Sequence, residues 1–246
     1  MRLRLRPGLT IATLIGLSAL VSLGVWQLRR LEWKRGLIAQ VEARLAAPPI
    51  AFDEAVAREG AGESLEYQPV FLDGVYANDL ESSVFGTYEG AAGVYVFTPL
   101  DAANPASGGR RFVYVDRGFA PQAFRDPSTR SDAEVKGKVR VEGLFRRTER
   151  RRGFEKWLAP EDQTADNLYF TRDPEILAAR HQLTVPPFYI DSFGRESGGS
   201  WPKGGLTRVE FPNRHLEYAL TWFGLAAALL GVFLTYSVKG GGQTKP

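Results

Sequence analysis

The stretch HLEYALTWFGLAAALLGVFLTYSV, residues 215–238, decides the architecture of this chain. It carries no charged residue from Tyr218 to Val238. At about 1.5 Å per residue, a helix of that length crosses the roughly 30 Å hydrocarbon core of a bilayer. A second uncharged run extends from Pro7 to Leu28. The sequence therefore predicts a membrane protein with two transmembrane α-helices, at residues 9–28 and 218–238.

The first run also permits another interpretation, a secretory signal, because Arg2, Arg4 and Arg6 form a charged segment before it. No clean A-x-A cleavage site follows the run, however. Trp26 and Trp33 lie close to two arginines there, which is typical of an interfacial anchor of aromatic rings and cations. We favour a retained membrane anchor.

Two spans place both ends of the chain on one side of the membrane. The predicted tails, residues 1–8 and 239–246, contain basic residues and no acidic ones. The positive-inside rule then predicts cytoplasmic tails in the cell inner (plasma) membrane, with the main domain in the periplasm. In a eukaryote the corresponding places are the mitochondrial inner membrane and the intermembrane space.

Residues 29–217 form the predicted extramembrane domain. Apolar residues at helical spacing continue the first helix until Pro48-Pro49, giving an N-terminal helical extension of about four turns. Short β-rich runs separated by turn residues then predict an α+β, mostly antiparallel fold, either a twisted sheet or a partly closed barrel. One helix interrupts it, with Asp173 as N-cap and Pro174 as the first helical residue. The predicted strands are 70–76, 83–88, 94–100, 111–117, 138–146, 168–171, 188–191 and 206–210.

The composition excludes several classes of function. The chain has no cysteine and two histidines, which excludes disulfides, thiolate metal sites and a multi-histidine catalytic centre within one chain. HExxH, GxSxG, P-loop and GxGxxG motifs are all absent. A membrane-tethered hydrolase with an unusual carboxylate site is the alternative, but no pair of nucleophile and base can be named for it, so we predict that the protein is not an enzyme. The basic run RRTERRR, 146–152, lacks stacking aromatics, which favours a solvated loop, or one facing anionic lipid or an acidic partner, over nucleic acid. Asp116 and Arg117 end a predicted strand, where we expect a buried ion pair, with a structural role favoured over a binding one.

His215 is the most informative polar residue, because it precedes the second span by three positions. His215, Tyr218 and Trp222 share one helical face, and the first helix reaches the same side of the membrane with Trp26, Gln27, Arg29 and Arg30. In an antiparallel helix pair these groups can face one another. An imidazole can ligate haem iron, guanidinium groups can meet propionates, and the rings can shelter the macrocycle. The alternative is that His215 is an ordinary interfacial residue at a helix start.

An ordered set of segments resembles the Surfeit locus protein 1 family, to which the yeast Shy proteins are related. The segments are GVWQLRRLEWK, YQPVFLDGVY, GVYVFTPL, VYVDRGFAP, VRVEGLFR, NLYFTRD, PFYID and PNRHLEYALTWFGLA. The resemblance covers nearly the whole chain, and the two helix-border motifs around a β-rich domain form a specific combination. The family commonly has Asn and Trp where this chain has Asp116 and Phe119, and Asn where it has Arg214.

The resemblance implies a non-enzymatic chaperone that assists assembly of a haem-copper oxidase. It implies that the chain binds haem a transiently and aids its insertion into the catalytic subunit of cytochrome c oxidase, its partner, with a haem a synthase as a further candidate partner. The implied cofactor-binding residues are His215, which would ligate the iron, with Tyr218, Trp222, Trp26 and Arg30. Gln27 and Lys34 are further positions of the first-span motif. Membrane lipid is a further expected contact, and nucleic acid is not. Two questions remain open: whether the client is a cytochrome c or a quinol oxidase, and whether the chain is instead a haem-independent membrane scaffold.

Overall fold

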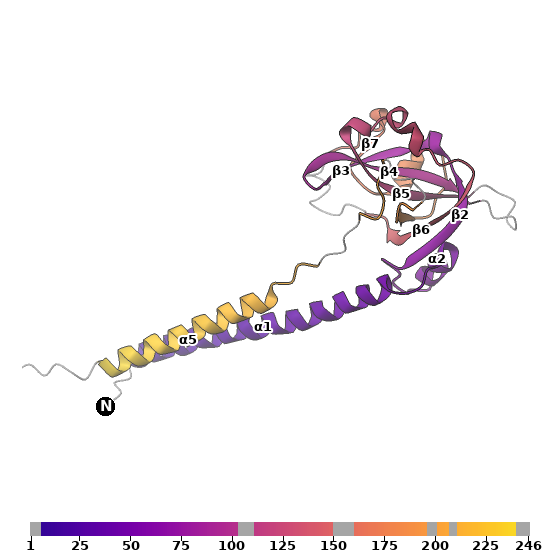
Figure 1. The fold of residues 1–246 in the computed structure, drawn as a ribbon. Helices are drawn as coiled ribbons and strands as arrows, with labels where there is room; N and C mark the ends of the chain where they lie inside the picture. The colour runs from indigo at the N-terminus through magenta and orange to yellow at the C-terminus, as the bar shows by residue number, and fades with distance from the viewer. Residues whose placement is uncertain (1–5, 103–110, 150–159, 196–200, 207–210, 240–246) are drawn as a thin grey trace, which may run out of the picture. The chain divides into compact units, whose positions relative to one another are not determined.

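The structure is a computed structural model, and we describe residues 6–102, 111–149, 160–195, 201–206 and 211–239 (Figure 1). The chain divides into two compact units, one formed by Met1–Val41 with Glu210–Pro246 and the other by Glu42–Val209. The first unit contains two long helices and the second a β-rich domain. The predicted fold class, two helices that could span a membrane and a mostly antiparallel domain between them, is confirmed.

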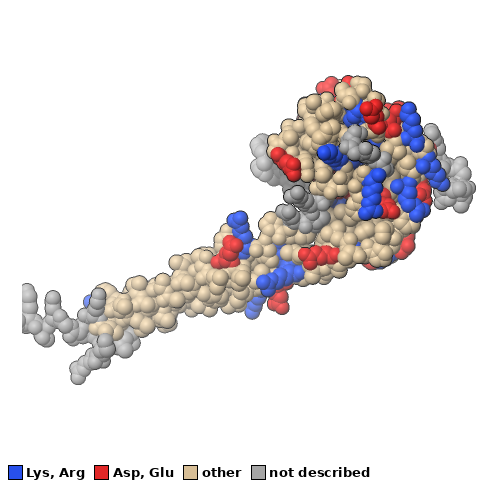
Figure 2. All heavy atoms as spheres, viewed as in Figure 1, with Lys and Arg blue, Asp and Glu red and all other residues tan. Residues whose placement is uncertain are grey.

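The two long helices are α1 (Pro7–Leu45) and α5 (His215–Lys239), and each is long and apolar enough to cross a membrane. In Figure 2 the helix pair is uncharged over a long stretch of its visible face. Helix α1 ends shortly before Pro48-Pro49, where the ring of proline cannot continue a helix, so the predicted extension is confirmed. Helix α5 begins at His215 and not at the predicted membrane border, which places the imidazole on its first residue.

The described part of the second unit contains one mixed sheet of eight strands, in the order β1-β2-β6-β8-β5-β4-β3-β7. Most neighbours are antiparallel, while β1–β2, β3–β7 and β5–β8 are parallel. Strand β2 also pairs with β4, so the sheet curls partly closed. The strands are β1 (Ile50–Ala51), β2 (Pro69–Tyr76), β3 (Ser82–Tyr88), β4 (Ala91–Asp101), β5 (Phe112–Pro121), β6 (Lys138–Arg147), β7 (Leu168–Tyr169) and β8 (Phe188–Ser192).

Strand β5 contributes to apolar clusters on both faces of the sheet. Its alternate side chains point to opposite faces, as the pleat requires. Val113 and Val115 pack in one apolar cluster with Phe52 of helix α2 (Phe52–Gly60). Tyr114, between them in sequence, packs in another cluster with Leu177 of helix α4 (Pro174–Ala179). Because both faces of β5 are covered, the strand reads as an almost continuous buried run.

Short helices connect these strands. The Asp173 carboxylate accepts a hydrogen bond from the Glu175 backbone N–H and Pro174 follows it, which confirms the predicted N-terminus of α4. The 3₁₀ helices are η1 (Asn78–Leu80), η2 (Gln122–Phe124), η3 (Pro127–Ala133) and η4 (Thr164–Asp166).

The basic run 146–152 was expected in a solvated loop or at a partner surface, which is wrong for Arg146: this residue lies in β6 and is buried, because its guanidinium pairs with carboxylates inside the domain. The later residues 150–152 lie outside the described part of the chain. Residues 207–210 of the predicted strand 206–210 also lie outside it.

Candidate functional site

Small residues bring α1 and α5 close together within the first unit. Gly24 of α1 faces the ring of Phe223, and a Cβ added to Gly24 would lie 2.6 Å from Phe223 Cε1. Ala219 and Ala226 of α5 are buried as well, as are Thr13 and Leu31 of α1. Close approach through glycine and alanine is typical of helix pairs in membranes, where lipid contacts compete equally well for larger apolar side chains.

Polar contacts join the two helices where α5 begins. The His215 imidazole is half-buried, and its Nδ1 lies 2.7 Å from Gln27 Oε1 of α1. About two turns further along α1, Lys34 donates from Nζ to the backbone carbonyl of Pro212. The segment that leads into α5 is therefore tied to α1 at two points.

The contact with Gln27 orients the His215 ring and favours an Nδ1–H donor. An amide Oε1 only accepts hydrogen bonds, so Nδ1 of the imidazole is the donor in this pair. In the neutral ring the other nitrogen, Nε2, then carries the lone pair. Histidines that ligate metals are commonly held in this way, with one ring N–H bonded to a neighbouring acceptor and the other nitrogen available to the metal.

The structure places the other predicted site residues differently. Trp222 is half-buried on the face of α5 that carries His215. Tyr218 lies at the edge of that face with 52% of its surface exposed, and Trp26 of α1 is 54% exposed. Arg30 is also exposed, and its guanidinium lies 4.2 Å from the ring centre of Trp33. The residue that reaches His215 is thus Gln27, rather than Trp26 or Arg30.

The sequence contained a signal for Gln27. Gly24, Gln27, Leu31 and Lys34 recur at alternating spacings of three and four, which places them on one helical stripe. Trp26 and Arg30 fall outside this stripe. Helical spacing, rather than suitability for haem, decides which side chains of α1 face the partner helix.

The arrangement can offer one imidazole nitrogen to a metal. Within the described ranges, no group of three or more His, Cys, Asp or Glu side chains could hold a metal ion. A single imidazole imposes no coordination geometry on a bare ion, whereas haem supplies four ring nitrogens of its own and needs only an axial ligand. The donor set around His215 therefore suits a haem better than an isolated ion.

A second polar cluster lies inside the β-rich unit. Asp116 on β5 is the register partner of Asp191 on β8, and both are buried. Arg146 Nη1 lies 3.6 Å from Asp191 Oδ2, and Arg146 Nε lies 2.8 Å from Glu66 Oε1. Burial, followed by repulsion from the Asp191 carboxylate, raises the pKa of Asp116 to about 7, although Arg172 and the Gly118 N–H oppose the shift. The cluster is a buried carboxylate pair balanced by arginines.

Arg117 takes no part in that cluster, so the expected ion pair between Asp116 and Arg117 is wrong. The two residues are neighbours on a strand, where successive side chains point to opposite faces. Asp116 accepts a hydrogen bond from the Gly118 backbone, while Arg117 donates from Nη2 to the Ala133 carbonyl. Sequence adjacency suggested a pair that the pleat of the strand prevents.

Comparison with known proteins identifies relatives along most of the chain. The family profile described as the SURF1 family matches residues 14–227. Surfeit locus protein 1 of Homo sapiens is 32% identical over 235 residues, 89% of this chain and 74% of the human protein. The rat protein of the same name is 32% identical over 221 residues, 84% of this chain and 68% of the rat protein. A SURF1-like protein of Monosiga brevicollis is 30% identical over 234 residues, 90% of this chain and 85% of that protein.

Proposed function

This chain belongs to the SURF1 family, and from that premise we propose that it is a non-enzymatic assembly factor for a haem-copper terminal oxidase. In this proposal the chain binds haem a transiently and aids its insertion into the catalytic subunit of cytochrome c oxidase. A haem a synthase is the source of the haem. The protein acts by holding and passing on a cargo.

The observation that carries the proposal is the contact between His215 and Gln27. His215 Nδ1 lies 2.7 Å from Gln27 Oε1, which leaves Nε2 as the nitrogen that would ligate the iron. The group lies where the uncharged part of α5 begins and where α1 carries Arg29 and Arg30. A position between apolar and charged surroundings suits a macrocycle with an apolar body and charged propionates.

The remaining site residues have supporting roles in this proposal. Trp222 lies on the His215 face, and Tyr218 at its edge provides a further ring beside the bound haem. The exposed Arg30 is available to a propionate, with Trp26 as an apolar neighbour on α1. One protein ligand and an open helix surface suit temporary binding, because a closed pocket would slow release.

We place the protein in the cell inner membrane, with both tails in the cytoplasm and the β-rich unit in the periplasm. The length and composition of α1 and α5 support two crossings, and the basic tails support this orientation. A reporter fused after Pro246 should be active only in the cytoplasm. Activity confined to the periplasm would refute the orientation.

The test of haem binding is the visible absorption spectrum of the full-length protein, purified in detergent after co-expression with a haem a synthase. The wild type is compared with His215→Ala, and His181→Ala serves as control because His181 is the other histidine and lies in the β-rich unit. We expect a haem a spectrum in the wild type and in the control, and its loss or shift in His215→Ala.

A second pair of variants tests the role of Gln27. Gln27→Ala should lower haem retention by roughly 10- to 100-fold, because the imidazole loses the acceptor that orients it. Gln40→Ala, an exposed glutamine on the same helix, should have no effect. If folded wild type contains no haem a when the haem is present, the carrier proposal fails. A haem-independent scaffold that stabilises an oxidase intermediate then remains, and its partner should co-purify equally with His215→Ala.

A further inference from the structure

Arg117 is the most deeply buried basic side chain among the described residues, with 2% of its surface exposed. It lies next to Gly118, whose φ of +110° marks an irregularity in the pairing of β4 with β5. A Cβ at Gly118 would lie 1.8 Å from the Lys203 carbonyl oxygen, so the backbone there admits only glycine. Local bulges of this kind commonly redirect a neighbouring side chain.

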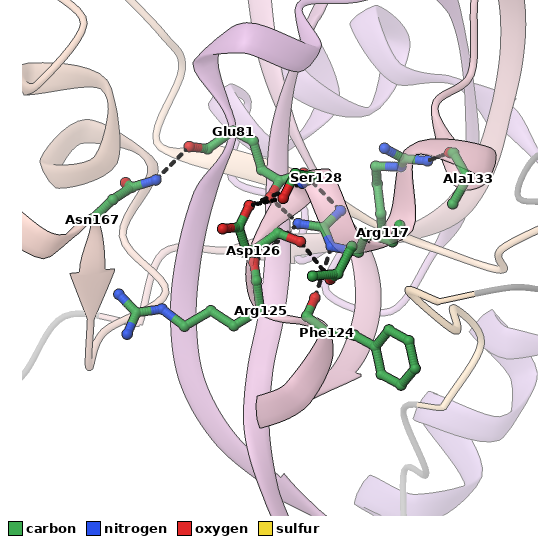
Figure 3. A network of polar contacts seen from close by, with 10 residues as sticks. Glu81, Arg117, Phe124, Arg125, Asp126, Ser128, Ala133 and Asn167 are labelled. Carbon is green, nitrogen blue, oxygen red and sulfur yellow. Dashed lines mark hydrogen bonds and ion pairs between the residues drawn. The ribbon is translucent and has the colours of Figure 1, made fainter.

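The guanidinium of Arg117 has few partners. Nη2 donates to the Ala133 carbonyl at 2.7 Å (Figure 3), and one face of the group lies over the Tyr76 ring, 4.9 Å from its centre. In the part of the chain that the structure describes, Nε has no hydrogen-bond partner and no carboxylate forms an ion pair with Arg117. A buried charge without a counter-ion is costly, and proteins normally pair such a charge.

The buried carboxylate of Glu81 already has a partner. The Glu81 carboxylate is held by Arg130, which donates from Nη1 at 3.0 Å and also from Nη2. The third side of the Arg130 guanidinium donates from Nε to the Phe124 carbonyl. Glu81 and Arg130 therefore neutralise one another, and within the described ranges Arg117 forms no ion pair with a carboxylate.

Arg117 lines a cavity of about 350 Å³, which we call the Arg117 pocket. Its lining also includes Asn78, Ser128, Arg130, Ser131 and Glu134. Asn78 donates from Nδ2 to the Val135 carbonyl, but its buried Oδ1 has no partner within the described residues. Two of the residues that line the pocket thus carry unused hydrogen-bonding groups, a cationic donor on Arg117 and a neutral acceptor on Asn78.

We propose that the Arg117 pocket binds a carboxylate group that has an N–H donor beside it, as at the carboxyl terminus of a polypeptide. The carboxylate accepts hydrogen bonds from Arg117, and the adjacent N–H donates to Asn78 Oδ1. Planar guanidinium groups match carboxylates well. Asp79 and Glu134 also line the pocket, and their negative charge disfavours a doubly charged phosphate or sulfate. This site lies wholly within the β-rich unit and does not rest on haem binding.

The test measures ligand binding to the full-length protein in detergent by isothermal titration calorimetry. N-acetylglycine carries the carboxylate and the neighbouring N–H, and N-acetylglycinamide replaces only the carboxylate by a neutral amide. We expect saturable binding of N-acetylglycine and at least about tenfold weaker binding of the amide, which corresponds to roughly 1.4 kcal/mol. Equal binding of the two compounds would refute the proposal, as would a preference for phosphate or sulfate over both.

Two arginine variants test whether Arg117 binds the carboxylate. Arg117→Met should abolish N-acetylglycine binding, whereas Arg140→Met, at an exposed arginine, should leave it unchanged. Because the Arg117 charge is unpaired, Arg117→Met should also keep or raise the melting temperature of the ligand-free protein. A large fall would show that the arginine is structural and would refute the proposal.

Asn78→Ala provides a second, milder variant. Acetate has a carboxylate but no N–H, so it should bind the wild type more weakly than N-acetylglycine does. In Asn78→Ala the two ligands should bind with equal affinity. An undiminished preference for N-acetylglycine in this variant would contradict the assigned Asn78 contact.

Discussion

Replacing Asp116 by Asn should stabilise the β-rich unit at pH 8. Asp116 is fully buried opposite Asp191, and burial together with that second carboxylate raises its pKa from 3.8 to about 7. Asn keeps an Oδ1 that can accept the 2.9 Å hydrogen bond from the Gly118 N–H. Its Nδ2 can donate to the Asp191 carboxylate, so one repulsive contact becomes a hydrogen bond.

The size of this stabilisation and its pH dependence follow from the difference between the pKa of Asp116 in the folded and in the unfolded protein. A pKa difference of this size corresponds to roughly 4 kcal/mol between the charged and neutral forms of Asp116. Between about pH 4 and 7 the folded protein binds the proton and the unfolded chain does not, so the contribution of Asp116 to stability falls as pH rises. Above pH 7 the loss is complete. We expect Asp116→Asn to raise the free energy of unfolding by about 2–4 kcal/mol at pH 8, and by almost nothing at pH 4.

The assay is chemical denaturation of the full-length protein in detergent at several pH values, followed by tryptophan fluorescence. Trp201 lies in the β-rich unit, 6.3 Å from the ring of Phe119, and reports its unfolding. Asp73→Asn is the control: Asp73 is partly exposed and paired with Arg140, which lowers the pKa of Asp73. This control should cost less than about 1 kcal/mol at neutral pH, and the cost should vanish as pH falls. A destabilised Asp116→Asn at pH 8, or an effect independent of pH, would refute the reasoning.

Two further substitutions test helix packing in the first unit and a buried ion pair in the second. Gly24→Leu should lower the thermal stability of the helix pair by roughly 1–3 kcal/mol in a circular dichroism melt, because the leucine side chain must displace the Phe223 ring. Gly36→Leu is the control and should be neutral, because nothing lies within 4 Å of a Cβ added there. Glu81→Ala should destabilise the β-rich unit by about 3–5 kcal/mol in chemical denaturation, since it leaves the buried Arg130 charge without its partner. A neutral Glu81→Ala would show that Arg130 finds another acceptor or water.

Most of the fold could be predicted from the sequence because its signals are local. An uncharged run of sufficient length predicts a helix that can span a membrane whatever surrounds it. The start of α4 is predicted by two residues alone: Asp173 has a side chain that accepts a hydrogen bond from the first turn, and Pro174 lacks the N–H that would be unpaired there. Strand positions followed from alternation and turn residues, although the parallel pairing of β5 with β8 did not, because nothing local specifies a partner so far along the chain.

The candidate site was predicted in part. His215 was found because it stands at the border of an uncharged helix, but its direct partner was not singled out. Gln27 lies 188 positions away, and it is the way the stripes of α1 and α5 pack that brings the two side chains together. Gly24 permits that packing, since any larger residue would meet the Phe223 ring.

The sequence by itself determined the two long apolar helices, the β-rich nature of the segment between them and the absence of thiol chemistry, because each depends on composition or on spacing of a few residues. Only the tertiary structure decided which partner each buried charged side chain has. Asp116 faces Asp191, and Arg117 turns into a pocket on the other side of the strand. The pleat separates residues that are adjacent in sequence, and strand pairing joins residues that are distant, so the charge balance of a buried site is a property of the folded chain.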